Sequence, residues 1–313
     1  MKLIKPKFWD KSFSFTAFLL MPFTLMVMLF NFLQKKFTKT IKFNIPIICV
    51  GNIYVGGTGK TPASIHIAKE ILKLGKNPAI LRKFYKEHQD EHRMIQENFK
   101  NLILDSNRVN GIRDIEKMNY DTVILDDGFQ DRKIHKDLNI LCFNQNQLIG
   151  NGFILPSGPL RESLKSIKNA EIILINGKKD YEFEKKIFNI NKKIKIFYSK
   201  YKPVNIDQFK GKKLLAIAGI GNPENFFQLL LENNLNVVKK LIYPDHYVFS
   251  ETEIKNIIKE ADINNYEIIM TEKDYFRIKD FKYNKIKYLK VLLEITDKEN
   301  LIKIISKLYD QSN

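Results

Sequence analysis

The sequence predicts an α/β protein whose main sheet is mostly parallel. After residue 44, short apolar runs rich in Ile, Leu and Val alternate with segments whose apolar residues recur at helical spacing. Runs that are apolar throughout are typical of parallel strands covered by helices on both faces. The chain has 313 residues, of which 44% are hydrophobic and 28% charged, so it is long enough for two globular domains.

The first strand is expected at 45–51, IPIICVG, and the helix after it at 61–74, where Ile67, Ile71 and Leu74 share one face. Further buried strands are expected at 77–81, 101–104, 122–128, 138–143 and 171–177. Residues 192–205 alternate and are rich in lysine, a pattern typical of an exposed strand or connector.

A second unit begins with a strand, a glycine turn and a helix over residues 212–230, and a final helix is expected near 297–309. The predicted organisation is an N-terminal anchor helix at 1–40, a nucleotide-binding domain at 41–205 and a smaller α/β domain at 206–313.

The segment 13–33 carries no charge over 21 residues, and lysines flank it on both sides. At 1.5 Å per residue it matches the hydrocarbon core of a bilayer, about 30 Å thick. Because both flanks are basic, the positive-inside rule does not orient it. A membrane-associated helix is expected, either spanning or lying in the interface with Pro22 as a kink. A buried helix over the soluble core is the other interpretation.

The chain is basic, with 52 Lys and Arg against 35 Asp and Glu, a net charge of +17. This excess suggests an anionic partner, or else a lysine-rich genome that places lysine on every solvated face. The lysines are scattered and lack interleaved aromatic residues, so no nucleic-acid partner is predicted. Cys49 and Cys142 both lie in apolar runs, which indicates buried, reduced thiols rather than metal ligands.

The stretch VGNIYVGGTGKTP at 50–62 predicts a phosphate-binding loop between a strand and a helix. Glycines let successive backbone N–H groups surround a phosphate, and the helix adds its N-terminal partial charge. In this pattern Lys60 reaches the β- and γ-phosphates of ATP, and the Thr61 hydroxyl ligates Mg²⁺. The predicted nucleotide-binding residues are Gly56, Gly57, Thr58, Gly59, Lys60 and Thr61.

Asp126 and Asp127 follow the apolar run of DTVILDDGFQ and predict the second magnesium anchor of such a site. One carboxylate holds the metal, while the other orders water or a ligand. The guanine-specificity pattern is absent, because TEKD at 271–274 places its lysine directly before the aspartate.

Six motifs then occur in a fixed order: VGNIYVGGTGKTP, ILDDGFQ, GNGFILPSGPLRESLKS, IAGIGNPENFF, YPDHYVFS and MTEKD. Together they resemble the tetraacyldisaccharide 4'-kinase (lipid A 4'-kinase) family from about residue 45 to 280. The resemblance implies ATP- and Mg²⁺-dependent phosphorylation of the 4'-hydroxyl of tetraacyldisaccharide 1-phosphate at the cytoplasmic face of a bacterial inner membrane. It also implies a P-loop α/β domain joined to a smaller C-terminal α/β domain, and no obligate protein partner.

Residue by residue, the resemblance implies that Asp90 activates the sugar hydroxyl and that His246, next to Asp245, reaches in from the second domain. The active-site cleft is expected to include Arg82, Arg108, Gln130, Arg161 and Glu162. The segment before the acidic residue departs from the family pattern: Lys83 replaces a glycine, and Gln89 replaces the glycine just before Asp90. A differently shaped loop is therefore expected around Asp90.

Two other functions fit part of the pattern. The core GGTGKT also suits a membrane-associated regulatory ATPase that delivers or partitions a protein cargo, but such ATPases carry a lysine where Val55 stands. A basic ATPase acting on nucleic acid has only the scattered lysines in its support. The missing lysine, together with the motifs PSGPLRE and PDHY, favours the lipid kinase.

Overall fold

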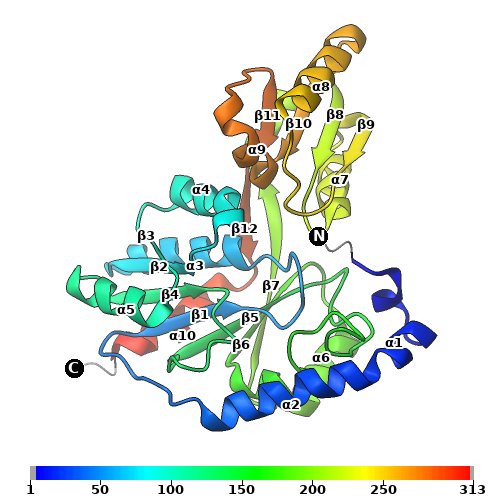
Figure 1. Ribbon diagram of the computed structural model, residues 1–313. Coiled ribbons are helices and arrows are strands. Elements are labelled where there is room, and N and C mark those ends of the chain that lie inside the picture. The colour runs from blue at the N-terminus through cyan, green and yellow to red at the C-terminus, as the bar shows by residue number, and fades with distance from the viewer. Residues whose placement is uncertain (1–4, 311–313) are drawn as a thin grey trace. The chain divides into compact units, whose positions relative to one another are not determined.

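A computed structural model describes residues 5–310 of the chain (Figure 1). Contacts divide the described chain into two compact units, and each contains its own sheet. The larger unit comprises Lys5–Phe84, Phe99–Lys200 and the residues from Leu293 onward. The smaller unit comprises Tyr85–Asn98 and Tyr201–Leu292.

These units differ from a linear division at residues 205 and 206 in two places. The segment Tyr85–Asn98 packs with the smaller unit, although it lies far upstream in the sequence, and the C-terminal helix packs with the larger unit. As a division into functional domains, the ranges 1–40, 41–205 and 206–313 stay a prediction.

Within residues 5–310, the larger unit holds an eight-stranded sheet, and every neighbouring pair from β7 to β3 is parallel. In spatial order its strands are β12 (Val291–Ile295), β7 (Lys195–Pro203), β6 (Ile172–Asn176), β5 (Leu138–Asn144), β1 (Ile47–Gly51), β4 (Thr122–Asp126), β2 (Pro78–Lys83) and β3 (Leu102–Asp105). The strands predicted from apolar runs are confirmed. Strands β1, β4 and β2 are consecutive in the sheet and parallel, so their carboxyl ends lie side by side.

Helices cover both faces of this sheet, as continuous apolar strands require. One face packs against α5 (Arg108–Lys117) and α6 (Tyr181–Ile190). Helix α3 (Lys60–Lys73) packs on β1, β2 and β4. The final helix α10 (Lys298–Asp310) joins this unit through Tyr309, whose hydroxyl lies 2.9 Å from that of Thr122.

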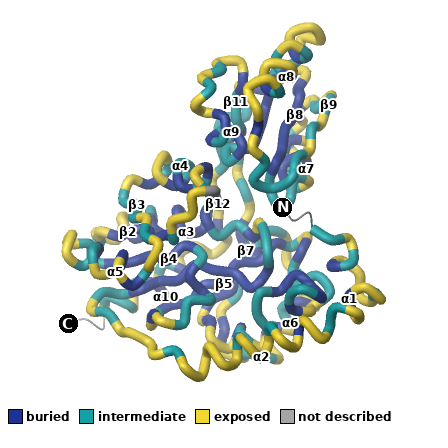
Figure 2. The backbone as a smooth tube through the Cα atoms, in the orientation of Figure 1, coloured by how far each residue is buried: buried dark blue, intermediate teal, exposed yellow. Residues whose placement is uncertain are grey.

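The N-terminal apolar segment forms two helices rather than one. Helix α1 (Phe15–Leu19) ends before α2 (Met21–Phe37), and a short 3-10 turn η1 (Lys7–Asp10) precedes both. Most of α2 is exposed (Figure 2), including its large apolar side chains. Over residues 5–310 the structure contains no helix with the length and apolar character needed to cross a membrane.

Helix α2 is held to the rest of the unit by its buried residue, Thr24. Thr24 is 2% exposed, and its hydroxyl donates to the Ile154 carbonyl at 3.2 Å and lies 2.8 Å from Ser157 Oγ. Ile154 and Ser157 belong to the segment 150–161, which also contains Leu160. Leu160 forms a β-bridge with Tyr54, just after β1, so this segment links α2 to the sheet.

The smaller unit contains a four-stranded parallel sheet among the described residues, in the order β11 (Ile286–Leu289), β10 (Glu267–Thr271), β8 (Lys213–Ala218) and β9 (Asn236–Ile242). Helix α7 (Pro223–Glu232) packs with alternate residues of β8 on one face. On the other face lies α8 (Glu251–Asn264), with the intervening residues of β8. Helix α4 (Gln89–Asn98), preceded by the 3-10 turn η2 (Lys86–His88), packs against α9 (Glu272–Ile278). Further 3-10 turns in the described chain are η3 (Leu164–Asn169), η4 (Ile206–Phe209) and η5 (Lys279–Phe281).

Candidate active-site residues

The glycine-rich segment forms a loop between β1 and α3, as predicted. Gly56 and Gly59 have φ values of 114° and 87°, which side chains rarely adopt, so glycine is required at both positions. Gly59 is the N-cap of α3, and Lys60 and Thr61 are therefore in its first turn. The backbone N–H groups at this end of a helix favour an anionic group.

Asn52, in the VGN part of the motif, stabilises this loop from within. Its amide donates to Thr58 Oγ1 at 2.8 Å and to the Gly56 carbonyl at 3.3 Å. The Asn52 carbonyl in turn accepts a hydrogen bond of 2.8 Å from Gln130 Nε2. Gln130, expected to line the cleft, thus anchors the loop, and the role of Asn52 was not predicted.

Asp126 ends β4, and the register pairs it with Val50 of β1 and with Arg82 of β2. The carboxylate is fully buried. It accepts hydrogen bonds from Thr61 Oγ1 at 3.2 Å and from Ser64 Oγ at 2.9 Å, and it forms an ion pair with Arg82. Arg82 Nη1 also lies 3.3 Å from Thr61 Oγ1. Ser64, one turn along α3 from Lys60, was not singled out from the sequence.

Asp127 has a positive φ of 58° and interacts with different partners from those of Asp126. Its carboxylate accepts from Arg161 Nη1 at 3.0 Å and lies 3.8 Å from Lys60 Nζ. Burial alone would raise the pKa of Asp127, but the positive charges of Lys60 and Arg161 hold it well below its usual range. Burial lowers the pKa of Lys60.

The remaining predicted cleft residues are also in the larger unit. Arg108, the first residue of α5, donates to the Asp127 carbonyl at 2.8 Å, and its Nη1 lies 3.4 Å from Asp131. Glu162 accepts from Arg132 at 3.4 Å instead of pairing with its neighbour Arg161. The adjacent residues Asp126 and Asp127 thus gather one group of polar and charged side chains, with Thr61 and Arg82 at Asp126 and with Lys60, Arg108 and Arg161 at Asp127.

Asp90 and His246 meet within the smaller unit. Asp90 lies in the first turn of α4 and is only 4% exposed, so it is neither solvated nor in the reshaped loop expected around it. His246 Nδ1 lies 3.5 Å from Asp90 Oδ2. The His246 backbone has a φ of 56°, and its ring stacks on that of His88 with centroids 4.5 Å apart.

Two cations of α9 complete this second group, and neither was predicted. Lys273 Nζ lies 2.8 Å from Glu91 Oε1 and 3.1 Å from Asp245 Oδ1, and Arg277 Nε donates to Asp90 Oδ2 at 2.7 Å. The available signal was the motif MTEKD, which begins α9. Burial alone would raise the pKa of Asp90, but its contacts with His246, Lys273 and Arg277 hold it well below its usual range.

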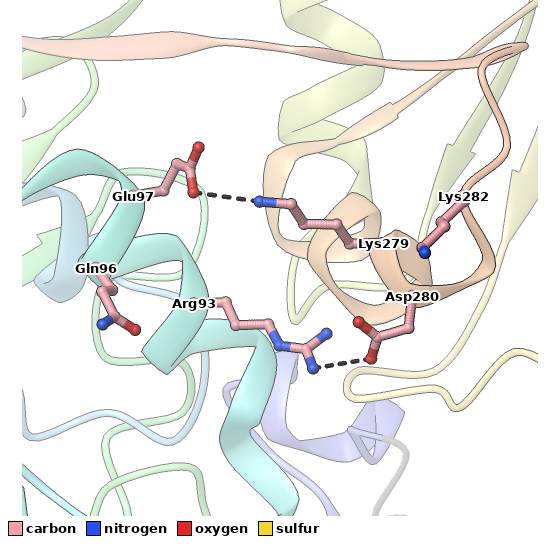
Figure 3. Close-up of a pocket in the computed structure, with 6 residues that line it drawn as sticks. All are labelled: Arg93, Gln96, Glu97, Lys279, Asp280 and Lys282. Carbon is pink, nitrogen blue, oxygen red and sulfur yellow. Dashed lines mark hydrogen bonds and ion pairs between the residues drawn. The ribbon is translucent and has the colours of Figure 1, made fainter.

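The smaller unit also contains a polar cavity of about 680 Å³ (Figure 3). Two ion pairs cross it, from Arg93 to Asp280 at 2.8 Å and from Lys279 to Glu97 at 3.2 Å. Because no predicted site residue lines it, we assign it no role in the chemistry.

Over residues 5–310, no group of three or more His, Cys, Asp or Glu side chains is arranged to hold a metal ion. The pair formed by the Thr61 hydroxyl and the Asp126 carboxylate nevertheless suits Mg²⁺, which binds through one or two protein oxygens and completes its shell with water and phosphate oxygens.

Comparison with known proteins identifies the family. Residues 16–310 match the profile described as LpxK, tetraacyldisaccharide-1-P 4'-kinase. The chain is 41% identical over 318 residues to the tetraacyldisaccharide 4'-kinase of Pelagibacter ubique strain HTCC1062, with 100% of both chains covered. It is 32% identical to that of Bartonella quintana strain Toulouse, covering 89% of this chain and 86% of the relative.

A solved structure agrees with these matches. The crystal structure of LpxK from Aquifex aeolicus, described as an "apo" form in complex with ATP, has a TM-score of 0.72 and 25% identity, covering 94% of this chain and 99% of that one. The full-length matches decide between the kinase and the regulatory ATPase. The chain therefore belongs to the tetraacyldisaccharide 4'-kinase family.

Proposed function

We propose that this family member, a kinase of lipid A biosynthesis, transfers the γ-phosphoryl group of ATP to the 4'-hydroxyl of tetraacyldisaccharide 1-phosphate with two groups of side chains. The group around Lys60 and Asp126 binds the nucleotide, and the group around Asp90 and His246 receives the acceptor hydroxyl. The observation that carries the nucleotide assignment is that Lys60, Thr61 and Asp126 converge at the carboxyl ends of β1 and β4.

The phosphates of ATP are assigned to the loop from Gly56 to Thr61. Glycines with positive φ let such a loop turn its backbone N–H groups inward, and the start of α3 adds a partial positive charge, which together favour an anion. Lys60 is half-buried and has Asp127 as a partner 3.8 Å away, so its ammonium is held near the loop before ATP arrives. Binding to a β- or γ-phosphate would exchange that long contact for a stronger one.

Thr61 and Asp126 are the residues that would hold Mg²⁺. When bound, the ion neutralises charge on the β- and γ-phosphates. Ser64 keeps the second oxygen of Asp126 in place at 2.9 Å, and Arg82 balances its charge. Arg161 and Arg108 bring two further positive charges beside Asp127, close to where negative charge develops on the transferred group.

Asp90 is the proposed acceptor of the hydroxyl proton. Its Oδ1 is buried without a hydrogen-bond partner among the described residues, so that oxygen is available to a substrate hydroxyl. The 4'-oxygen then attacks the γ-phosphorus, the bond to the β–γ bridging oxygen breaks, and ADP leaves. A carboxylate whose pKa lies well below its usual range is a weak base, so it mainly orients the hydroxyl and takes the proton late. His246 stabilises the ionised carboxylate.

The lipid substrate requires access to a bilayer, and α1 and α2 supply an apolar surface for it. Phe15, Phe18, Met26 and Phe30 are all at least 62% exposed, far more than a large apolar side chain would be in a soluble core. Lysines at the end of α2 suit anionic headgroups. We assign this surface to the inner membrane on the cytoplasmic side, where ATP is present.

The direct test incubates the purified protein with γ-labelled ATP, Mg²⁺ and tetraacyldisaccharide 1-phosphate in detergent micelles, with buffer in place of the lipid as the control. We expect label in the lipid and little release of phosphate without it. ATP hydrolysis that is independent of the lipid, with no labelled lipid, would contradict the assignment.

A further inference from the structure

Asp274 is fixed at the start of α9 by its own motif. Thr271 is the N-cap of this helix; its Oγ1 accepts from the Asp274 backbone N–H at 3.1 Å and donates to Asp274 Oδ2 at 2.6 Å. The same carboxylate accepts from the Gly219 N–H at 2.8 Å and is fully buried. Thr271 of the motif MTEKD and the Gly219 N–H thus hold the Asp274 carboxylate at a defined point.

That carboxylate holds Arg277 one turn further along α9. Arg277 forms an ion pair with Asp274 and donates from Nη1 to the Gly219 carbonyl at 2.6 Å. Gly219 has to be small here, because a Cβ atom would lie 3.0 Å from Asp274 Oδ1 and 3.3 Å from Arg277 Nη1. The Asp274 carboxylate and the Gly219 carbonyl therefore both hold Nη1 of the guanidinium, and the Arg277 side chain is only 7% exposed.

The third contact of Arg277 goes to Asp90. Nε donates to Asp90 Oδ2 at 2.7 Å, which occupies one carboxylate oxygen and leaves Oδ1 without a hydrogen-bond partner in the described chain. Because the guanidinium is planar and two acceptors hold its Nη1, the direction in which Nε donates is set. Arg277 therefore fixes both the position of the Asp90 carboxylate and the choice of the oxygen that stays available.

We propose that Arg277, held by Asp274 and Gly219, is a positioning residue for the phosphoryl transfer, because it orients Asp90 towards the acceptor hydroxyl. The proposal rests on the proposed role of Asp90. It also assigns a role to the motif MTEKD. Thr271 and Asp274 of this motif hold Arg277 in place, and Lys273 forms ion pairs with Asp245 and Glu91.

Other charged groups face Asp90, so Arg277 is not its sole influence. From α9 these are Lys273 and Asp274, from the segment before α8 Asp245 and His246, and from α4 Glu91. His88 stacks on His246 and completes the set. Substituting Arg277 alone leaves Lys273 and His246 in place, so the carboxylate loses its directed hydrogen bond and one of its compensating charges.

The test compares the purified full-length enzyme with the variants Asp90→Asn, Arg277→Gln, Arg277→Lys and Arg93→Gln. Arg93 is the matched control, because it also links α4 to the segment around α9, through Asp280 and the Phe276 carbonyl, but does not contact Asp90. The kcat and the KM for ATP are measured with the lipid acceptor between about pH 5 and pH 8, and thermal unfolding reports on the fold.

We expect Asp90→Asn to lower kcat at least about 100-fold. Arg277→Gln should lower kcat about 10- to 100-fold at pH 7 with KM for ATP within about two-fold of wild type, and its kcat should begin to fall at a higher pH than that of wild type, because the Asp90 carboxylate has lost one of its compensating charges. Arg277→Lys keeps the positive charge but loses the directed hydrogen bond from Nε to Asp90. Its kcat should therefore be lower than that of wild type, while its pH dependence should match that of wild type. Arg93→Gln should resemble wild type.

Two results would overturn the proposal. One is wild-type kcat and pH profile in Arg277→Gln. The other is a loss of kcat that is equal at every pH and tracks a lowered melting temperature, since that would mark Arg277 as merely structural. If instead Asp90→Asn keeps the turnover of wild type, the proposed role of Asp90 is wrong. This result separates a failure of the role of Asp90 from a failure of the role of Arg277 alone.

Discussion

Arg82 and Asp126 form a buried ion pair between neighbouring strands, and the same guanidinium lies 3.3 Å from the Thr61 hydroxyl. The parallel register of β2 and β4 sets the two residues directly opposite each other at the carboxyl ends of their strands. A cation of the chain thus contacts both of the side chains that are proposed to hold Mg²⁺.

Replacing Arg82 with methionine should lower the free energy of unfolding by about 3–5 kcal/mol, because it leaves the Asp126 charge buried without a compensating cation. Urea unfolding measures the change. Adding Asp126→Asn should recover part of the loss, since the two substitutions act on one interaction. Equal stability of Arg82→Met and wild type would contradict the burial of this pair.

Replacing Lys60 with alanine should abolish phosphoryl transfer and leave the fold intact. Lys60 is in the first turn of α3, and its long 3.8 Å contact with Asp127 contributes little to stability. Turnover with labelled ATP is compared with the thermal unfolding of the same preparation. Near-normal turnover would exclude this loop as the nucleotide site.

Replacing Thr24 with valine should lower the free energy of unfolding by about 1–3 kcal/mol, because the hydroxyl is buried and its partners lose a hydrogen bond. Thr38→Val is the control, since its hydroxyl bonds to Gln34 at the exposed end of the same helix. A similar effect of both substitutions on the melting temperature would show that α2 is not tied to the segment 150–161.

Replacing Met26 and Phe30 together with aspartate should reduce binding to vesicles that contain anionic lipid. The two side chains are one turn apart on α2 and are 67% and 62% exposed, so the fold should tolerate the change. Val248→Asp is the control, because Val248 is 77% exposed in the other unit. Unchanged cosedimentation of the double variant would show that the membrane surface is elsewhere.

Stability should decrease as the pH falls below the ordinary range of an aspartate. The pKa of Asp90 in the folded chain is depressed, so its contribution is fully present above the ordinary pKa of about 4 and is lost as the pH falls through the lower folded value. Asp245, whose pKa burial would raise, is likewise depressed by Lys273 and His246. Burial raises the pKa of Asp274, which acts in the opposite direction.

The comparison of wild type with Asp90→Asn isolates one group. Urea unfolding at about pH 5 and pH 3 should show a smaller loss of stability for the variant than for wild type. An equal loss of stability in wild type and variant would mean that the neighbouring charges do not lower the pKa of Asp90.

The parts of this protein that could be predicted from the sequence are those whose signal is local. Continuous apolar runs predicted β1, β4 and β5, and the glycines before Lys60 predicted the loop, because a buried parallel strand and a left-handed turn each restrict the residues at their own positions. The ordered motifs were also sufficient to indicate the family.

Which distant residues share an environment could not be predicted, because it depends on how the chain folds. The helix that carries Asp90 packs with residues more than a hundred positions later, and a run of charges in the sequence does not indicate that one of them is buried against Arg277. The same holds for Thr24, a polar residue in an apolar segment whose partner Ser157 lies 133 positions away. Hydrogen bonds and burial depend on which surfaces meet after folding, and a local pattern carries no information about that meeting.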